Sequence, residues 1–431
     1  MTTDVETRGP AVTLADVEAI SRDDPEWLRK KRLEAWRLYE SMDLPDPGDE
    51  EWRRTDVRAI PIEGLRPARF SAGPAAVPEL SQDLQTRGVI LSGLNEAASQ
   101  RDNIVREHLY RLVEPDEWKY VALNAAAWSE GVFLYVPKGV EVTIPVNYVH
   151  GIAGGGETTA FSRVLIVVEE NSRLTFIDET SSEGEARGLV SGAVEIFAGD
   201  GAKVEYYNIN RWGRNVYNFN TVRARLGKDA QFLGVAVGLG SKLTKMRVDT
   251  LLPETGARVD LLGLTFGDGD QHFDYNTLQD HYGKHTQSEL QFKSALTDSA
   301  SLVWYGVTHI RPSAGGSAAN QTSRNLLLSE HAKAAPIPIL EIEAYDVEKC
   351  SHGATVGPVD ENELFYLQSR AIPRDVAERM LVEGYFADVV ARIPDARLRA
   401  RIMGAVLEKM GGAIETFSAD DVLGAVAAEA S

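Results

Sequence analysis

The first part of the chain carries the hydrophobic spacing of helices. Between residues 24 and 42 an apolar residue recurs at every third position, and charged residues fill the gaps. The recurring apolar residues are Leu33, Trp36, Tyr39 and Met42. The pattern predicts a helix over about 24–42, short helices around 104–112 and 116–123, and a mainly helical domain over residues 1–130.

From about residue 131 the pattern changes to short runs of β-forming residues. Glycines and polar turns separate these runs. They occupy residues 132–136, 164–168, 174–177, 194–197, 204–207 and 232–237. Strand-sized runs at this spacing indicate a mostly β core, which we expect to extend over residues 131–345.

One four-residue pattern returns along the β-rich region. It consists of a polar turn residue, a small residue, a polar or charged residue and a β-former. Its copies lie at 171–174, 201–204, 229–232, 256–259 and 299–302, with a degenerate copy at 331–334. The small residue advances by 30, 28, 27, 43 and 32 residues, and the longest step leaves room for an insertion around 272–285.

A repeat of this length is typical of stacked supersecondary units, whose periods run from about 20 to 50 residues. One such unit cannot bury its apolar face alone, but stacking buries that face against the next coil. The repeat favours a β-helix in which the small residue lets the chain turn at a corner. A β-sandwich with hairpins at regular spacing is the alternative.

The last part of the chain returns to helical spacing. Two apolar stripes recur there, separated by Pro394. The first comprises Val376, Ala377, Met380 and Leu381, and the second comprises Leu398, Ile402, Ala405, Val406 and Met410. The stripes predict two amphipathic helices in a C-terminal domain over residues 346–431, where they either cap the solenoid or dock a partner.

The net charge and the cysteine content indicate the cellular compartment and the classes of binding partner. Lys and Arg number 45 against 64 Asp and Glu, which leaves a net charge of −19. Nucleic acids and anionic membranes attract basic surfaces, so we expect neither as a partner. No apolar run approaches the ~18–20 residues of a membrane span, and the first ten residues lack a signal-peptide core. Cys350 is the single cysteine, which excludes an internal disulfide, and we expect a cytoplasmic protein.

Motifs of common enzyme chemistry are missing from the sequence. It contains no GxxxxGK[ST] phosphate loop, no GxSxG nucleophile elbow and no HExxH zinc helix. With one cysteine, the chain also cannot hold an iron–sulfur cluster through four thiolates of its own. We therefore expect a protein that is not an enzyme by itself.

The best candidates for metal chemistry are Cys350 and His352. Residues two apart in an extended chain face the same side, so the thiol and the imidazole could bind one iron or zinc ion. Two ligands underfill a four-coordinate metal, so a second chain would have to supply the others. The alternative is that Cys350 packs as a small apolar residue.

Two further groups of residues allow a functional interpretation. His272, His281 and His285 lie within fourteen residues and form either a metal site or ordinary core and surface histidines. An acidic run precedes Cys350 and holds Glu341, Glu343, Asp346 and Glu348. Paired carboxylates on a β-helix are typical of polysaccharide-degrading enzymes, which makes a carbohydrate-active enzyme the alternative function. A solvated strand face is the simpler interpretation of the same run.

Several runs together resemble the SufB/SufD family of iron–sulfur cluster assembly proteins. The strongest are KCSHGATVG at 349–357, LFYLQSRAI at 364–372 and MLVEGYF at 380–386, supported by PEWL at 25–28 and EWRRT at 51–55. The likeness covers most of the chain. It implies a right-handed parallel β-helix core flanked by N-terminal and C-terminal helical domains.

Within this family the residues favour the SufD side. SufB-type chains carry a glutamate where this chain has Gly353, and a cysteine where it has Ser323. Both departures remove candidate ligands. We therefore expect that the chain alone holds no cofactor and builds no cluster.

The resemblance implies a scaffold subunit of the SUF system. It implies a complex with a SufB-type subunit and with a SufC-type ATPase, which would dock on the C-terminal helices and hydrolyse the ATP. Iron or an iron–sulfur cluster would be shared with the SufB-type subunit, through His352 first and Cys350 second. A homodimer of the isolated chain, and a purely structural role for both residues, stay open.

Overall fold

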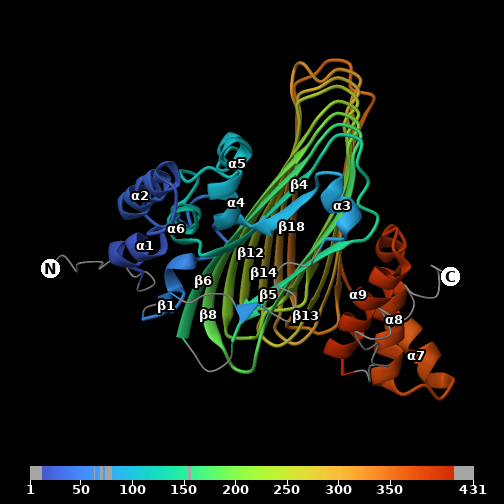
Figure 1. Ribbon diagram of the computed structural model, residues 1–431. Coiled ribbons are helices and arrows are strands. Elements are labelled where there is room, and N and C mark those ends of the chain that lie inside the picture. The colour runs from blue at the N-terminus through green and yellow to red at the C-terminus, as the bar shows by residue number, and fades with distance from the viewer. Residues whose placement is uncertain (1–11, 63, 68–70, 73–79, 154–156, 412–431) are drawn as a thin grey trace. The chain divides into compact units, whose positions relative to one another are not determined.

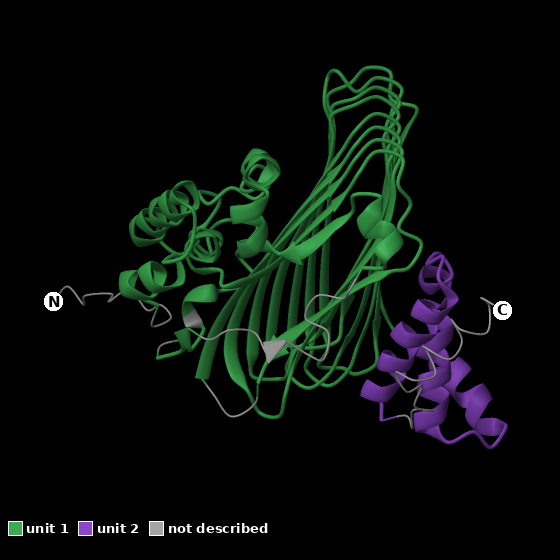
Figure 2. Cartoon of the chain, in the orientation of Figure 1, with its two compact units in different colours: residues 1–358 green, residues 359–431 purple. Residues whose placement is uncertain are grey.

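The structure is a computed structural model that describes residues 12–62, 64–67, 71–72, 80–153 and 157–411. It separates into two compact units, residues 1–358 and residues 359–431 (Figure 2). The first unit holds a layer of helices and a long two-sheet solenoid (Figure 1). The elements described in the second unit are helices.

Two sheets run through the first unit. The first sheet contains, in spatial order, β18 (Lys333–Ile342), β16 (Ser301–Ile310), β14 (His272–His281), β12 (Leu243–Leu252), β10 (Val216–Leu226), β8 (Arg187–Ala198), β6 (Glu157–Val168), β4 (Glu130–Val136) and β3 (Ile90–Gly93), with β1 (Arg66–Pro67) beside β6. The second contains β19 (Lys349–Pro358), β17 (Ala318–Leu327), β15 (Gln287–Leu296), β13 (Arg258–Gly267), β11 (Gln231–Gly238), β9 (Lys203–Arg211), β7 (Arg173–Ser182), β5 (Val146–Ile152) and β2 (Ser71–Ala72).

The chain alternates between these sheets, strand by strand. Neighbouring strands from β4 to β18 and from β5 to β19 are parallel, whereas β3 and β2 pair antiparallel to β4 and β5. A chain that changes sheet after every strand and always returns one strand further on is a solenoid. The predicted β-solenoid flanked by helices is confirmed.

The chain enters six strands of the second sheet, β7 to β17, through a corner with a left-handed backbone. The corner residues have φ angles of 54° to 76° and are Asn171, Gly201, Asp229, Gly256, His285 and Gly316. Glycine, asparagine and aspartate adopt this conformation most readily. A buried small residue follows each of them: Ser172, Ala202, Ala230, Ala257, Thr286 and Ser317. This corner is the physical basis of the repeated four-residue pattern.

The prediction of an insertion around 272–285 is wrong. Residues 272–281 form the regular strand β14, and the corner missing from the predicted series is His285–Thr286. Ala300 and Ala332 directly precede β16 and β18, so they belong to corners of the first sheet. The apparent step of 43 residues, from 257 to 300, joined a corner of the second sheet to a corner of the first. The copy between them was overlooked because Thr286 stands where the three preceding corners have alanine.

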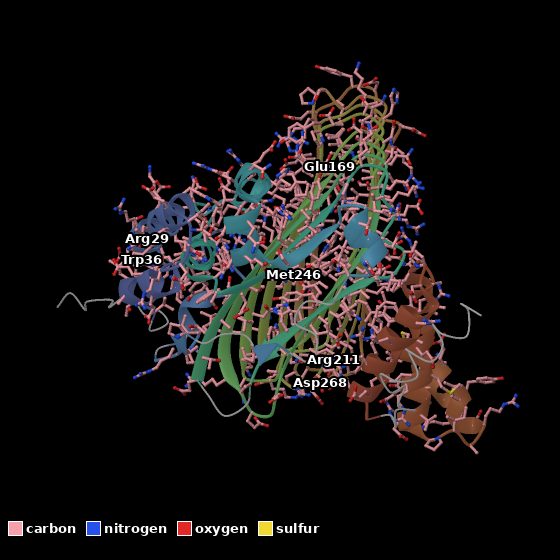
Figure 3. The ribbon with its side chains drawn as sticks, in the orientation of Figure 1. Arg29, Trp36, Glu169, Arg211, Met246 and Asp268 are labelled. Atoms are coloured by element: carbon pink, nitrogen blue, oxygen red, sulfur yellow. The ribbon has the colours of Figure 1, made fainter. Side chains whose placement is uncertain are left out.

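Aliphatic side chains stack in rows between the two sheets. Val164, Val194, Val222 and Val248 are successive partners on β6, β8, β10 and β12, and each is at most 4% exposed. Met246 lies among the same strands (Figure 3). Burying a valine side chain stabilises a fold by roughly 1.5–3 kcal/mol, so the rows hold successive coils in register.

Helices cover part of the outer face of the first sheet. They are α1 (Leu14–Ile20), α2 (Glu26–Ser41), the 3₁₀ helix η1 (Val57–Ala59), α3 (Gln82–Thr86), α4 (Leu94–Gln100), α5 (Asp102–His108) and α6 (Lys119–Ala127). Every residue of α6 is buried. Trp36 of α2 belongs to the apolar cluster that α2, α4 and α6 form with this face (Figure 3). The helices predicted around 24–42, 104–112 and 116–123 are confirmed as α2, α5 and α6.

A buried ion pair fastens this helical layer to the solenoid. Arg163 on β6 donates to Glu195 on β8 at 2.9 Å, and both side chains are 0% exposed. The Glu195 carboxylate also accepts the backbone N–H groups of Tyr110, Leu112 and Val113 at 2.9–3.2 Å. One carboxylate therefore satisfies three otherwise orphaned donors of the loop between α5 and α6.

The second unit contains α7 (Glu361–Ser369), α8 (Arg374–Val390) and α9 (Ala396–Lys409). On α9 the buried residues are Leu398, Ile402 and Val406, as the second stripe predicts. On α8 the buried side runs through Val382 and Phe386. Met380, expected in the first stripe, is instead 46% exposed.

We predict that Glu195→Gln destabilises the first unit by roughly 3–5 kcal/mol, because it leaves the buried Arg163 guanidinium without a counter-charge. Urea unfolding would measure the change, and proteolysis should cut the helical layer first. Glu50→Gln is the matched control, since it removes exposed pairs with Arg53 and Arg54 and should leave the unfolding midpoint close to that of the wild type. Equal unfolding midpoints for the two variants would contradict the role of Glu195.

Candidate functional site

Cys350 and His352 lie on β19, the last strand of the second sheet. The strands of the solenoid therefore continue to Pro358, past the boundary expected at residue 345. Cys350 pairs with Ala319 of β17, and His352 pairs with Gln321. Since alternate residues of a strand share a face, the thiol and the imidazole point to the same side of the sheet.

The two side chains differ in their surroundings. Cys350 is partly buried and packs against the small apolar cluster of Ile310, Ala314, Ala319 and Ala344. Burial raises the pKa of the Cys350 thiol, which keeps it protonated at neutral pH. His352 is exposed. A neutral imidazole can bind a metal directly, so His352 is the better ligand of the two.

These donors do not complete a metal site by themselves. In the part of the chain that the structure describes, no group of three or more His, Cys, Asp or Glu residues is arranged to hold a metal ion. A tetrahedral iron or zinc site needs four ligands. The pair fits an iron or cluster cargo only if another chain brings the remaining donors.

The solenoid has one covered end and one open end. At the N-terminal end β3 and β2 pair with β4 and β5, and β1 adds to β6. At the other end β18 and β19 are the last strands of their sheets, and no strand among the described residues pairs with their outer edges. Cys350 and His352 lie on this open end.

The three histidines considered as a metal site are not brought together. His272 and His281 begin and end β14, and a strand of that length separates its ends by about 30 Å. His281 is fully buried, with Nδ1 at 2.7 Å from Thr286 Oγ1 and Nε2 at 2.9 Å from Ser288 Oγ. His285 takes the left-handed corner conformation with φ 56°. The interpretation as ordinary core and surface histidines holds.

His272 has a structural role that the sequence did not suggest. Its Nε2 lies 2.8 Å from Thr55 Oγ1, and its Nδ1 lies 2.7 Å from Ser301 Oγ. Thr55 also donates to Asp274, which pairs with Lys245 at 2.9 Å. Burial lowers the pKa of His272, so the imidazole stays neutral within this network. The network binds the segment before η1 to β12 and β14.

The acidic run before Cys350 surrounds an imidazole instead of forming a free carboxylate pair. Glu343 lies 3.0 Å from Nε2 of His309, and Glu341 lies 3.4 Å from its Nδ1. Both glutamates are about half exposed at the rim of the first sheet. The arrangement agrees with a solvated strand face and offers no independent acid and base.

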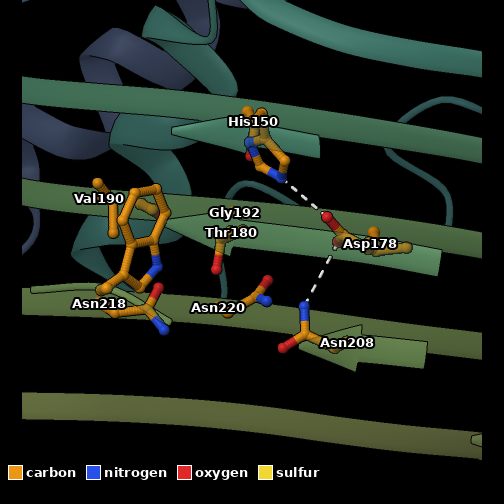
Figure 4. A pocket seen from close by; sticks show the side chains of 12 residues that line it. His150, Asp178, Thr180, Val190, Gly192, Asn208, Asn218 and Asn220 are labelled. Carbon is orange, nitrogen blue, oxygen red and sulfur yellow. Dashed lines mark hydrogen bonds and ion pairs between the residues drawn. The ribbon is translucent and has the colours of Figure 1, made fainter. Parts of the chain in front are cut away.

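A small polar cavity between the sheets was missed from sequence (Figure 4). Its volume is about 20 Å³, which is room for one water molecule. Asp178 lies on its wall, 2.8 Å from His150 Nε2. Its carboxylate accepts hydrogen bonds from the Tyr206 hydroxyl at 2.7 Å and from Asn208 Nδ2 at 3.4 Å. Burial raises the pKa of Tyr206, so its hydroxyl remains a donor. The only sequence signal was a run of polar residues at inward positions of β5, β7 and β9.

Within the described residues, no helix is long and apolar enough to cross a bilayer.

Comparison with known proteins gives a family-level likeness over nearly the whole chain. Residues 150–385 match the family described as SUF system FeS cluster assembly, SufBD core domain. Residues 76–148 match the SufBD protein N-terminal region. The two matches meet at the start of the solenoid.

Individual relatives agree with these matches. The chain is 31% identical to iron–sulfur cluster assembly protein SufD of Bacillus subtilis (strain 168), over 90% of this chain and 95% of that protein. It is 28% identical to iron–sulfur cluster assembly protein SufB of the same strain, over 88% and 89%. It is 27% identical to a SufBD family protein of Staphylococcus epidermidis (strain ATCC 12228), over 86% and 87%.

We predict that burial of His281 makes the solenoid less stable in mild acid. Burial lowers the pKa of His281 to about 4, against an unfolded value near 6.5, so the unfolded chain binds the proton more tightly. The contribution of neutral His281 to the free energy of unfolding is fully present above about pH 6.5. It is lost as the pH falls towards 4, by about 3 kcal/mol in total.

Urea unfolding between pH 7 and pH 4 measures this loss. His281→Gln should flatten the dependence, because glutamine does not titrate in that range. The control His331→Gln changes an exposed histidine and should leave the dependence as it is. A pH dependence unchanged by His281→Gln would show that other groups cause it.

Proposed function

The chain belongs to the SufB/SufD family, on its SufD side, and we propose that it is a scaffold subunit for iron–sulfur cluster assembly. It acts together with a SufB-type subunit and a SufC-type ATPase, and is not an enzyme by itself. The observation that carries the proposal is the position of Cys350 and His352, side by side on one face of the strand that ends the solenoid. A partial set of metal ligands on an open end suits a site completed by a partner.

The two open edges differ in their capacity to accept another strand. Backbone N–H groups point alternately to the two sides of a strand in a parallel sheet. Glu343 donates its N–H to Ile310 of β16, so the odd-numbered residues of β18 face β16 and the even-numbered residues face outward. Pro336 and Pro338 occupy two outward positions, and proline has no N–H to offer. The edge of β18 is therefore blocked in its middle.

The edge of β19 is not blocked in this way. Ala318 donates its N–H to Thr286 beside β15, so the odd-numbered residues of β17 face β19. Since Ala319 pairs with Cys350, the odd-numbered residues of β19 bond back to β17 and the even-numbered residues face outward. The outward residues are Cys350, His352, Ala354, Val356 and Pro358, and the one proline among them ends the strand. An unprotected edge is a template for pairing with a second chain. We assign this edge, next to Cys350 and His352, to the SufB-type subunit, whose side chains would complete the iron site.

The second unit offers a separate surface for the ATPase. Phe365 and Tyr366 of α7 are 72% and 58% exposed, and Met380 of α8 is 46% exposed. Aromatic residues and methionine are enriched in protein interfaces. We assign this surface to the SufC-type ATPase. Since the sequence has no phosphate loop, ATP hydrolysis would reside in that partner and would act on the scaffold through the second unit.

Anaerobic reconstitution of the three-protein complex tests the iron contact. We predict that His352→Ala lowers cluster formation, read by visible absorbance, at least tenfold, because it removes a direct ligand and even an outer-shell partner contributes about 10- to 100-fold. Cys350→Ser should have a smaller effect, since the buried thiol is protonated. His331→Ala is the control for loss of an exposed histidine. Cluster yields of His352→Ala equal to wild type would reject the role of His352 and favour a purely structural subunit.

A crossed pull-down tests the two docking surfaces at once. Ala354→Pro removes one outward N–H of β19 and should abolish retention of the SufB-type subunit while the ATPase stays bound. The double change Phe365→Ala and Tyr366→Ala should do the opposite. Ala354→Val keeps the N–H and is the control for the side chain. Loss of both partners in both variants, or of neither, would contradict the separate surfaces.

A further inference from the structure

Gln321 of β17 is a buried glutamine that is fixed at one end only. Its side chain is 0% exposed. Its Nε2 donates to the carbonyl of Ile339 on β18 at 2.9 Å, which ties the amide to the opposite sheet. Its Oε1 is buried, and no donor among the described residues bonds to it. A buried acceptor without a donor is costly, so it indicates a partner that binds in another state of the molecule.

The neighbours of Gln321 identify that partner. On one side the ladder places Leu290 of β15 beside it, and leucine has no donor. On the other side the ladder places His352 of β19 beside it. Gln321 lies on the inward face of β17, and His352 occupies the same face of β19. Adjacent strands are about 4.8 Å apart, so an imidazole N–H is within reach of the amide oxygen after a side-chain rotation.

Exposure of His352 explains why the bond is not closed in the isolated chain. His352 is exposed because β19 is the last strand, whereas Gln321 lies one strand further in. A second chain on the edge of β19 would cover the imidazole and restrict its rotation. Water would then no longer compete for its N–H, and the buried Oε1 would be the acceptor at hand.

We propose that Gln321 is a positioning residue for His352. Its Oε1 accepts the N–H of one ring nitrogen, which fixes the tautomer and leaves the lone pair of the other nitrogen directed to the open end. Metal-bound histidines generally donate their second nitrogen to such an acceptor, and losing it weakens metal binding about 10- to 100-fold. The inference rests on the proposed function, in which His352 contacts iron.

The matched control is a second buried glutamine of the same interior. Gln279 on β14 is 1% exposed, and its Nε2 has no bonded acceptor among the described residues. Its strand pairs with β12 and β16, so it has no ladder contact with β19. Gln279→Met therefore disturbs the interior to a similar degree without touching His352.

The experiment uses the full chain labelled with ¹⁵N-histidine, bound to the unlabelled SufB-type subunit at pH 8 without metal. The ¹⁵N shifts of the His352 ring, assigned with His352→Ala, report its tautomer. One tautomer should dominate in the wild type and in Gln279→Met, and a mixture should appear in Gln321→Met. Gln321→Glu, which keeps an acceptor, should restore the single tautomer. Identical His352 shifts in wild type and Gln321→Met would overturn the inference.

Ferrous iron titration of the same complexes separates this inference from the proposed function. Gln321→Met should weaken iron binding about 10- to 100-fold relative to Gln279→Met. If the tautomer changes but iron binding does not, Gln321 still positions His352 and the iron contact of the proposed function is wrong. Should Gln321→Met prevent assembly with the partner, Gln321→Leu takes its place in the complex, and His352 shifts equal to those of the wild type there also overturn the inference.

Discussion

Each coil of the solenoid hydrogen-bonds to the coil before it and to the coil after it, and everything else in the first unit depends on that register. The corners keep the register because a left-handed residue and a buried small residue recur at the entries to β7, β9, β11, β13, β15 and β17. A finite stack must leave two ends with unpaired strands. Antiparallel strands cover one end, and the other presents β18 and β19 with free edges. The candidate site, Cys350 and His352, lies at that second end.

Buried polar groups attach the helical layer to particular strands of this stack. Glu195 and Arg163 join the helical layer to β6 and β8, at the covered end. The network of Thr55, His272 and Lys245 extends the same attachment to β12 and β14. These contacts fix a helical layer over the early coils only. The last strands of the first unit carry acidic side chains around His309 and the pair Cys350 and His352.

Three properties of β19 decide how Cys350 and His352 can act: strand alternation, burial of the thiol and exposure of the imidazole. Alternation places Cys350 and His352 on one face, burial weakens the thiol as a ligand, and exposure leaves the imidazole free to move. Pro336 and Pro338 leave the middle of the β18 edge without N–H donors, whereas the edge of β19 keeps its donors there. Gln321 lies on the neighbouring strand β17, and no donor among the described residues bonds to its Oε1. A partner that pairs with β19 would therefore cover His352, orient it and add the missing donors in a single event.

The sequence alone determined the helix of residues 24–42, the stacked β repeat, the helical C-terminal part and the pairing of Cys350 with His352 on one face. These follow from periodicity and alternation, which are local properties of the chain. Only the tertiary structure decided which corner follows which, since Thr286 hides one copy of the repeat, and that His272, His281 and His285 lie apart. The cavity beside Asp178, the Glu195 pair and the place of Gln321 beside His352 join residues about 30 or more positions apart. Such contacts arise from the register between coils, and no local pattern specifies that register.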